Sequence, residues 1–145
     1  MTMDSSTILV VEDNPDDRDL LARAFRKAGI AMPIRFAVDG EEAVAYLGGT
    51  PGTAPEGRPA VILLDLKLPG RSGFEVLEWI KNHPVLRRVP VIILTSSRED
   101  VDLRRAYDLG ANSYLVKPAR SDDLLRMVEQ IHAYWVGFNQ APTPL

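Results

Sequence analysis

The sequence predicts an α/β domain in which helices cover both faces of a doubly wound, five-stranded parallel sheet. Short apolar runs of strand length recur along the 145 residues, and helix-length amphipathic segments lie between them. Two of the runs, AVILLD (60–65) and VPVIILT (89–95), are almost continuously apolar, as is typical of parallel strands buried on both faces. Regular alternation of strands and helices specifies a parallel sheet with helices on both sides.

Five strands and five helices follow from these patterns. Leu109-Gly110 is a usual helix stop, and Ser121 is the expected N-cap of the last helix. The expected strands are 8–11, 34–37, 60–65, 89–95 and 113–116, and the expected helices are 16–28, 39–47, 73–82, 98–110 and 121–137.

The chain length and composition suit one domain. With 145 residues, 46% of them hydrophobic, the chain can bury one substantial core but not two ordinary ones. We expect a flexible N-terminus at 1–6, the domain at 7–137, a C-terminal tail at 138–145 and no further output domain. The segment 48–59 holds four glycines and three prolines and is expected to be a surface loop.

Charge and cysteine content exclude several classes of function. The net charge is −3 and no Lys/Arg cluster is visible, which argues against a nucleic-acid partner. The chain has no cysteine, so disulfides, Cys-ligated zinc and thiol chemistry are excluded. The first apolar run is four residues long, too short for a signal peptide or a membrane span. We therefore expect a cytoplasmic protein without a membrane partner.

Polar residues follow the ends of four predicted strands. Glu12 and Asp13 come after the first strand, Asp65 and Thr95 end the third and fourth, and Lys117 follows the fifth. In an open parallel sheet, functional groups collect beyond the carboxyl ends of the strands. We therefore expect these five side chains to converge on one edge of the sheet.

The residue types at this edge suit a metal ion and a phosphoryl group. Two carboxylates about 4 Å apart repel by roughly 4 kcal/mol at an effective dielectric near 20. A hard cation such as Mg²⁺ prefers oxygen ligands and would offset that repulsion. Lys117 supplies a mobile point charge and Thr95 a hydroxyl donor. Asp16 and Asp17 are interpreted only as favourable charges at a helix start.

Four separated motifs resemble the receiver domains of two-component response regulators. They are VVEDN, LLDLKLPGRSG, IILTSS and SYLVKP, and the resemblance covers about residues 7–137. It implies a flavodoxin-like fold with strand order 2-1-3-4-5. LVVEDNPxD, the Gly/Pro loop, GANSYLVKP and the C-terminal YW are in addition similar to the stand-alone regulators of bacterial phytochrome histidine kinases.

The resemblance implies a phosphoacceptor and a Mg²⁺ site. Asp65 would accept a phosphoryl group from a phosphohistidine on a sensor histidine kinase. Asp13 and Asp65 would ligate Mg²⁺, with Glu12 acting directly or through water and the backbone carbonyl of Lys67 adding an oxygen. Glu12 stands where the family usually has Asp, a change that lengthens the side chain by one methylene.

The same resemblance implies a conformational switch. Lys117 would contact the phosphoryl group, Thr95 would move toward it, and Tyr114 would swing inward. Ordinary half-buried packing is the alternative for Tyr114, since aromatic residues are common in strands. The family also implies a cis peptide bond between Lys117 and Pro118.

The last helix carries a broad apolar stripe. Six residues have helical spacing and are expected to face the sheet: Leu124, Leu125, Val128, Ile131, Trp135 and Phe138. The stripe is either a wide core contact or part of a homodimer surface formed by 98–110, 113–116 and 121–137, and the resemblance suggests dimerisation. The candidate residues for that surface are Tyr107, Met127, Tyr134 and Phe138.

Three functions remain open at this stage. The leading one is a single-domain, Mg²⁺-dependent phosphorylation switch that catalyses only its own phosphorylation and dephosphorylation. The second is a degenerate receiver that acts as an interaction scaffold, against which the complete set of site residues argues. The third is an aspartate-nucleophile phosphatase, which usually has a second Asp two residues after the nucleophile, where this chain has Lys67.

Overall fold

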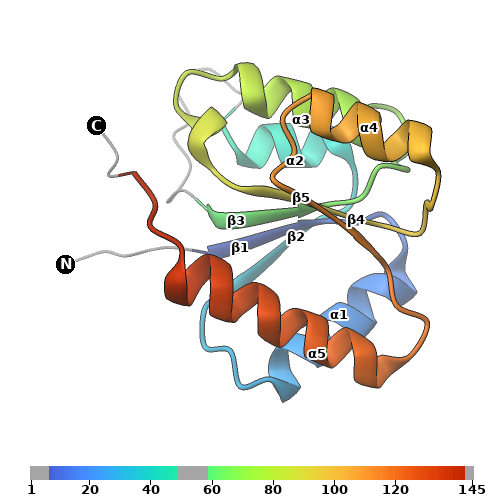
Figure 1. Cartoon of the computed structure of the whole chain (residues 1–145), viewed down its shortest axis with the longest axis vertical. Coiled ribbons are helices and arrows are strands. Elements are labelled where there is room, and N and C mark those ends of the chain that lie inside the picture. The colour runs from blue at the N-terminus through green and yellow to red at the C-terminus, as the bar shows by residue number, and fades with distance from the viewer. Residues whose placement is uncertain (1–6, 49–58, 143–145) are drawn as a thin grey trace.

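A five-stranded parallel sheet forms the centre of the computed structural model, which describes residues 7–48 and 59–142 (Figure 1). The strand order is β2-β1-β3-β4-β5, and each neighbouring pair is parallel, so the predicted fold is confirmed. The expectations for 1–6, for most of the loop 48–59 and for the last three residues lie outside the described residues. The strands are β1 (Thr7–Val11), β2 (Ile34–Ala37), β3 (Pro59–Leu64), β4 (Val91–Thr95) and β5 (Ser113–Val116).

Helices cover both faces of the sheet. Figure 1 shows α1 and α5 on one face and α2, α3 and α4 on the other. A short 3-10 turn, η1, precedes β4, and a π-helix, η2, continues α5. The bounds are α1 (Pro15–Lys27), α2 (Gly40–Tyr46), α3 (Gly73–Asn82), η1 (Leu86–Arg88), α4 (Asp100–Asp108), α5 (Ser121–Ile131) and η2 (His132–Phe138).

Alternation along the strands divides the core into two layers. Ile8 and Val10 of β1 belong to the cluster that includes side chains of α1 and α5. Leu9 and Val11 belong to the cluster that includes side chains of α2 and α3. Successive strand residues point to opposite faces, so each central strand contributes to both layers. This explains why β3 and β4 are almost continuously apolar.

Side-chain caps fix the starts of α1 and α3. The Asn14 side chain accepts a 3.0 Å hydrogen bond from the Asp17 N–H, and Pro15 occupies the first helical position. Ser72 and Glu75 form a reciprocal capping box at the start of α3. Both helices follow loops at the carboxyl ends of β1 and β3, so the caps also fix the positions of those loops.

Two details of the last two helices test the expectations about helix ends. Gly110 has φ +104° and follows α4, so the predicted stop is confirmed. The expectation that Ser121 caps α5 is wrong, because Arg120 occupies the N-cap position without a side-chain bond and Ser121 is the first helical residue. α4 itself begins at Asp100, two residues later than the pattern indicated.

The C-terminal part of the last helix departs from α-helical geometry. The α-helix ends at Ile131 and a π-helix continues to Phe138. Trp135 still packs against the core layer of α1 and α5, but Phe138 is 77% exposed, so the expectation that it faces the sheet is wrong. The wider π turn changes the angular spacing of side chains, and the spacing rule for an α-helix no longer applies. Within 7–48 and 59–142, none of the helices is both long and apolar enough to span a membrane.

Candidate functional site

Three carboxylates meet at the carboxyl end of the sheet. Glu12 and Asp13 follow β1, Asp65 follows β3, and one oxygen atom from each lies within 4.8 Å of the other two. Glu12 and Asp65 are 2% and 6% exposed, whereas Asp13 is open to solvent. Three carboxylate oxygens at this spacing, one of them accessible, fit a small hard cation that keeps several waters.

Backbone hydrogen bonds determine where these acids lie. The Asp65 N–H donates to the carbonyl of Val11 at 3.1 Å, which ties the end of β3 to the end of β1. Arg18 of α1 donates to the carbonyls of Glu12 and Asp13 at 2.9 and 2.8 Å. The sheet register and the first turn of α1 therefore hold the acidic pair rigidly beside Asp65.

Gly73 allows the loop after β3 to fold back against Asp65 and Leu66 at the end of that strand. A Cβ atom at this position would lie 2.1 Å from the Asp65 carbonyl oxygen and 2.6 Å from the Leu66 Cα. The Gly73 N–H donates to the Leu66 carbonyl at 3.0 Å. Any larger residue would push the start of α3 away from Asp65, so a glycine is required here for close approach.

Lys117, which follows β5, joins the acidic cluster. Its Nζ lies 2.6 Å from Glu12 Oε1, 2.9 Å from Asp65 Oδ2 and 2.8 Å from Asp17 Oδ2. The second oxygen of Asp65 accepts a 3.3 Å bond from the Lys67 backbone N–H. One ammonium group thus contacts three carboxylates that come from β1, α1 and β3.

These contacts shift two pKa values. Burial raises the pKa of Glu12 above its ordinary value, and its bonds with Lys117 and Asn14 offset this only in part. Burial also acts to lower the pKa of Lys117, but hydrogen bonds to Asp17, Glu12 and Asp65 outweigh it and raise that pKa. Lys117 therefore remains charged over the whole physiological range.

A second group of contacts extends from the end of β4. Thr95 is fully buried, and its Oγ1 accepts a 3.4 Å bond from the Ser97 N–H. The Ser97 carbonyl accepts a 3.1 Å bond from the Tyr114 hydroxyl of β5. Tyr114 is half-buried against the core. The predicted switch pair of Thr95 and Tyr114 is therefore linked through Ser97.

The peptide bond between Lys117 and Pro118 is trans, so the expected cis bond is wrong. An X-Pro bond favours trans by about 0.5–1 kcal/mol when the surroundings do not select cis. The Lys117 N–H donates to the Thr95 carbonyl at 2.8 Å, and its ammonium reaches the acids with the trans bond in place.

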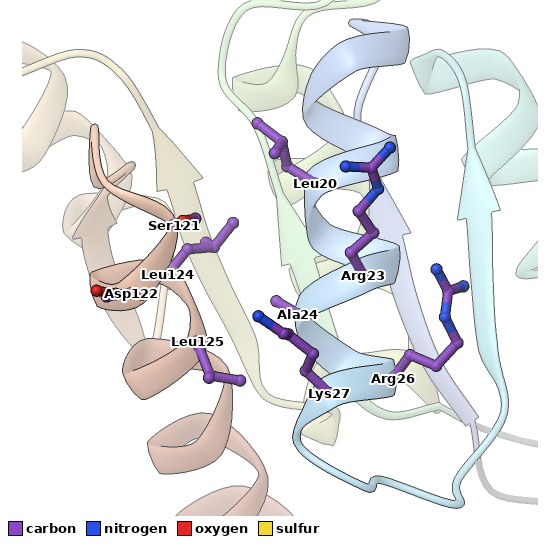
Figure 2. Close-up of a pocket in the computed structure, with 9 residues that line it drawn as sticks. All are labelled: Leu20, Arg23, Ala24, Arg26, Lys27, Ser121, Asp122, Leu124 and Leu125. Carbon is purple, nitrogen blue, oxygen red and sulfur yellow. The ribbon is translucent and has the colours of Figure 1, made fainter.

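A groove lies between α1 and α5 beside this site (Figure 2). Its volume is about 470 Å³. Leu20 and Leu124 line both this groove and a smaller cavity that reaches Asp17, Lys117 and Pro118. The groove lining is apolar and basic: Leu20, Ala24, Leu124 and Leu125 with Arg23, Arg26 and Lys27, beside Ser121 and Asp122.

Comparison with known sequences identifies the family. The sequence family described as response regulator receiver domain matches residues 8–129, which include the acidic cluster and Lys117. The chain belongs to this family. Receivers of this kind work in two-component signalling with sensor histidine kinases, and phosphorylation of an aspartate and Mg²⁺ binding are typical of them.

Three regulators are similar to this receiver over nearly its whole length. The probable methanogenesis regulatory protein FilR2 of Methanothrix harundinacea is 45% identical over 97% of this chain and 90% of its own length. Response regulator Rcp1 of Synechocystis is 38% identical over 89% of this chain and 88% of its own length. The crystal structure of its Mn²⁺-bound form has a TM-score of 0.83, with 36% identity, and the match covers 95% of this chain and 99% of that one. The crystal structure of the phosphorylated cyanobacterial phytochrome response regulator RcpA has a TM-score of 0.87, with 37% identity, and the match covers 95% of this chain and 99% of that one. This receiver thus resembles the phytochrome-associated regulators.

Sequence reasoning missed the tertiary contacts that three residues make in this receiver site. Asp17 was interpreted as a helix-start charge alone, yet it forms an ion pair with Lys117. Ser97 connects Thr95, Tyr114 and α4, and Gly73 permits the close approach to Asp65. The S-x-x-E capping box at Ser72 was a signal that could have located the tight loop around Gly73. No local pattern indicates the other two contacts.

Proposed function

We propose that Asp65 is the phosphoacceptor of this receiver. The observation that carries the proposal is the position of Asp65, whose Oδ2 lies 2.9 Å from Lys117 Nζ and whose carboxylate belongs to the cluster with Glu12 and Asp13. Phosphoryl transfer requires mainly positioning and charge stabilisation from a protein. An ammonium and a cation-binding cluster beside one carboxylate supply both.

The proposal includes a Mg²⁺ ion held by Glu12, Asp13, Asp65 and the Lys67 backbone carbonyl. The spacing of the three carboxylate oxygens supports it, and so does the Mn²⁺-bound form of the similar regulator Rcp1. When bound, such an ion offsets the negative charge of the acceptor and of the incoming phosphoryl group. Asp13 is the exposed member, so exchange of the ion with solvent passes beside it.

In the transfer step, an Asp65 carboxylate oxygen attacks the phosphorus atom of a phosphohistidine. The new P–O bond forms as the P–N bond breaks, and the imidazole leaves with the bonding electron pair. Lys117 already lies beside Asp65 and would contact the phosphoryl oxygens. In this proposal the receiver catalyses only its own phosphorylation and, with water as the attacking group, its dephosphorylation.

The proposed switch acts through Thr95 and Tyr114. A phosphoryl group adds hydrogen-bond acceptors that the Thr95 hydroxyl can satisfy. Because the Ser97 N–H is bonded to Thr95 Oγ1 and the Ser97 carbonyl to Tyr114, movement of Thr95 alters both contacts. Phosphorylation would then bias the position of the β4–α4 loop and of α4.

Acetyl phosphate with Mg²⁺ tests the acceptor. Intact-mass spectrometry of the native protein is expected to show one added phosphate, and Asp65→Asn should show none. Asp108→Asn, an exposed acid at the end of α4, is the matched control and should be modified like the wild type. Absence of the adduct from the wild type would favour the scaffold function, and equal modification of Asp65→Asn would show that the acceptor is another residue.

The proposed phosphoryl donor is a phytochrome-type sensor histidine kinase. Similarity to Rcp1 and RcpA supports this class, whereas the name of FilR2 points to a regulator of methanogenesis. We propose that an acid-faced helix of the kinase docks in the groove between α1 and α5, because Arg23, Arg26 and Lys27 line that groove and two of its other residues, Leu20 and Leu124, also line the cavity that reaches Lys117. The proposal includes a cytoplasmic location and, given the net charge of −3, no nucleic-acid partner.

Phosphotransfer from a purified, autophosphorylated phytochrome-type kinase tests the donor and the groove together. Rapid transfer to the wild type and slower transfer to Arg23→Glu are expected, with equal labelling of both proteins by acetyl phosphate. Failure of transfer to the wild type would exclude the phytochrome class. Equal transfer to Arg23→Glu would exclude the groove as the docking surface.

We propose a homodimer formed through α4, β5 and α5 together with η2, the helix that continues α5. Tyr107, Tyr134 and Phe138 support it as exposed aromatic side chains, whereas Met127 packs partly against the core and contributes less. Light scattering with and without beryllofluoride tests whether assembly depends on phosphorylation. The double variant Tyr134→Ser/Phe138→Ser should lower the measured mass, and Val85→Ser, an exposed valine before η1, should not.

A further inference from the structure

Lys117 has one more carboxylate partner than the proposed chemistry requires. Glu12 and Asp65 belong to the cluster that can hold a cation, but Asp17 does not. Asp17 belongs to α1 and lies 100 positions before Lys117, and its Oδ2 is 2.8 Å from Nζ. A helix-start acid gains its favourable interaction from the helix dipole alone, so that role does not explain the ion pair.

The chain fixes Asp17 in this position. Its backbone N–H donates to the side chain of Asn14, which caps α1, and Pro15 sets the first helical residue. Asp16 shares the first turn of α1 but is exposed, and the ion pairs of Lys117 are with Glu12, Asp17 and Asp65. The two neighbouring acids therefore share the helix dipole and differ in contact with the lysine.

We propose that Asp17 is a positioning residue that holds Lys117 in competition with the phosphoryl group on Asp65, and thereby weakens the phosphorylated state. This inference rests on the proposed function of Asp65. An ammonium has three N–H donors, and all three face carboxylates in this structure. Phosphorylation converts the Asp65 carboxylate into an uncharged acyl group, and Lys117 can then bond more than one phosphoryl oxygen only if it leaves Glu12 or Asp17.

Burial indicates which carboxylate is released. The side chains of Glu12 and Asp65 are 2% and 7% exposed, whereas that of Asp17 is 35% exposed. Water can solvate Asp17 again at little cost, whereas Glu12 is poorly hydrated and would keep only the bound cation as its counter-charge. Phosphorylation thus exchanges the Asp17 contact for a phosphoryl contact.

Asp17 opposes the phosphoryl group in two ways. It must release Lys117, and its own negative charge remains close to the lysine that the phosphoryl group approaches. Glu12 and Asp65 still hold the lysine in the site when Asp17 is neutralised. Removal of this charge should therefore strengthen binding of a phosphoryl group rather than disorder Lys117.

Titration with beryllofluoride in the presence of Mg²⁺, followed by NMR, tests this inference. Asp17→Asn should bind beryllofluoride about twofold to fivefold more tightly than the wild type, the range expected for a partly exposed ion pair. Asp16→Asn removes the same charge from the same helix turn and should bind like the wild type. Asp17→Glu restores the carboxylate and should return the affinity toward the wild-type value.

Mg²⁺ affinity separates a positioning role from a general structural one. Asp17 lies outside the cation cluster, so Asp17→Asn should bind Mg²⁺ alone like Asp16→Asn while its beryllofluoride affinity differs. Equal beryllofluoride affinities for the two variants, or weaker binding by Asp17→Asn, would overturn the inference. If the wild type accepts phosphate from acetyl phosphate and binds beryllofluoride, either result refutes only the role of Asp17 and leaves the proposed function standing. If wild type does neither, the proposed function itself fails.

Discussion

The Ser97 hydroxyl donates a 2.6 Å hydrogen bond to the Asp102 carboxylate and thereby joins the loop after β4 to α4. The start of α4 has little other support, because Glu99 occupies the N-cap position without a side-chain bond. Only Ala106 of this helix is buried. The contact between Ser97 and Asp102 is therefore a principal anchor of an element that the proposed switch would move.

Replacement of Ser97 by Ala should loosen α4. The change removes a hydrogen bond to a charged acceptor, which is worth about 1.5–3 kcal/mol when it is well formed. Amide hydrogen exchange within α4 should become about tenfold faster or more. Ser96→Ala, a change at the exposed neighbouring serine, is the control and should leave the exchange unaltered. Unchanged exchange in Ser97→Ala would show that other contacts anchor the helix.

Replacement of Lys117 by Met should destabilise the metal-free protein. It leaves Glu12, Asp17 and Asp65 without their shared counter-charge, and loss of one partner of a largely buried ion pair costs about 3 kcal/mol or more. Urea unfolding without divalent ions measures this, with Lys27→Met, an exposed change on α1, as the control.

Mg²⁺ should stabilise Lys117→Met more than it stabilises the wild type. In the wild type the ion and the ammonium use the same carboxylates of Glu12 and Asp65, and the variant removes that competition. The same urea titrations, repeated over a range of Mg²⁺ concentrations, give this comparison. An equal gain for both proteins would indicate that the cation binds elsewhere.

Mg²⁺ affinity should fall as the solution is acidified. The fall should begin at a higher pH than it would for a site whose glutamate has an ordinary pKa. Burial raises the pKa of Glu12 above 4.5, so a proton occupies its carboxylate already at a pH where an exposed glutamate is ionised. That proton must leave before the oxygen can bind a cation, so affinity rises with pH through the raised pKa. Calorimetric titration over an acidic pH series measures this, and Glu12→Gln should shift the transition.

The contribution of Lys81 to the free energy of unfolding should change with pH in the alkaline range. Its ammonium donates to the carbonyls of Arg87 and Val89 and to Asn112 Oδ1, at 3.2, 3.0 and 3.0 Å. Burial lowers its pKa below 10.5, so just below that pH the unfolded chain binds more protons than the folded one. The contribution of Lys81 to the free energy of unfolding therefore rises with pH in this window.

Comparison of wild type with Lys81→Met tests that dependence. The variant should be less stable at neutral pH by about 1–3 kcal/mol, because it removes three hydrogen bonds from a charged donor, one of them to the carbonyl of buried Val89. The deficit should grow as the pH approaches 10.5, since only the wild type is relieved of a buried charge. Lys27→Met should track the wild type throughout, and a constant deficit for Lys81→Met would contradict the lowered pKa.

Much of the fold and site could be predicted because their signals are local. Apolar runs marked the strands, and the carboxyl-end rule brought Glu12, Asp13, Asp65 and Lys117 to one edge, where the structure has them. The capping behaviour of Ser121, the π-helical turn before Phe138 and the trans bond at Pro118 could not be predicted in this way. Each depends on small energy differences between backbone geometries that neighbouring elements decide.

The sequence by itself determined the parallel sheet, the acidic pair and the family to which this receiver belongs, because hydrophobic periodicity and motif spacing are properties of the chain. Only the tertiary structure decided that Asp17 contacts Lys117 and that Ser97 joins Thr95, Tyr114 and α4. Asp16 and Asp17 are chemically identical and adjacent in sequence. They differ because the sheet order and the cap on α1 bring only one of them within reach of a lysine 100 positions away.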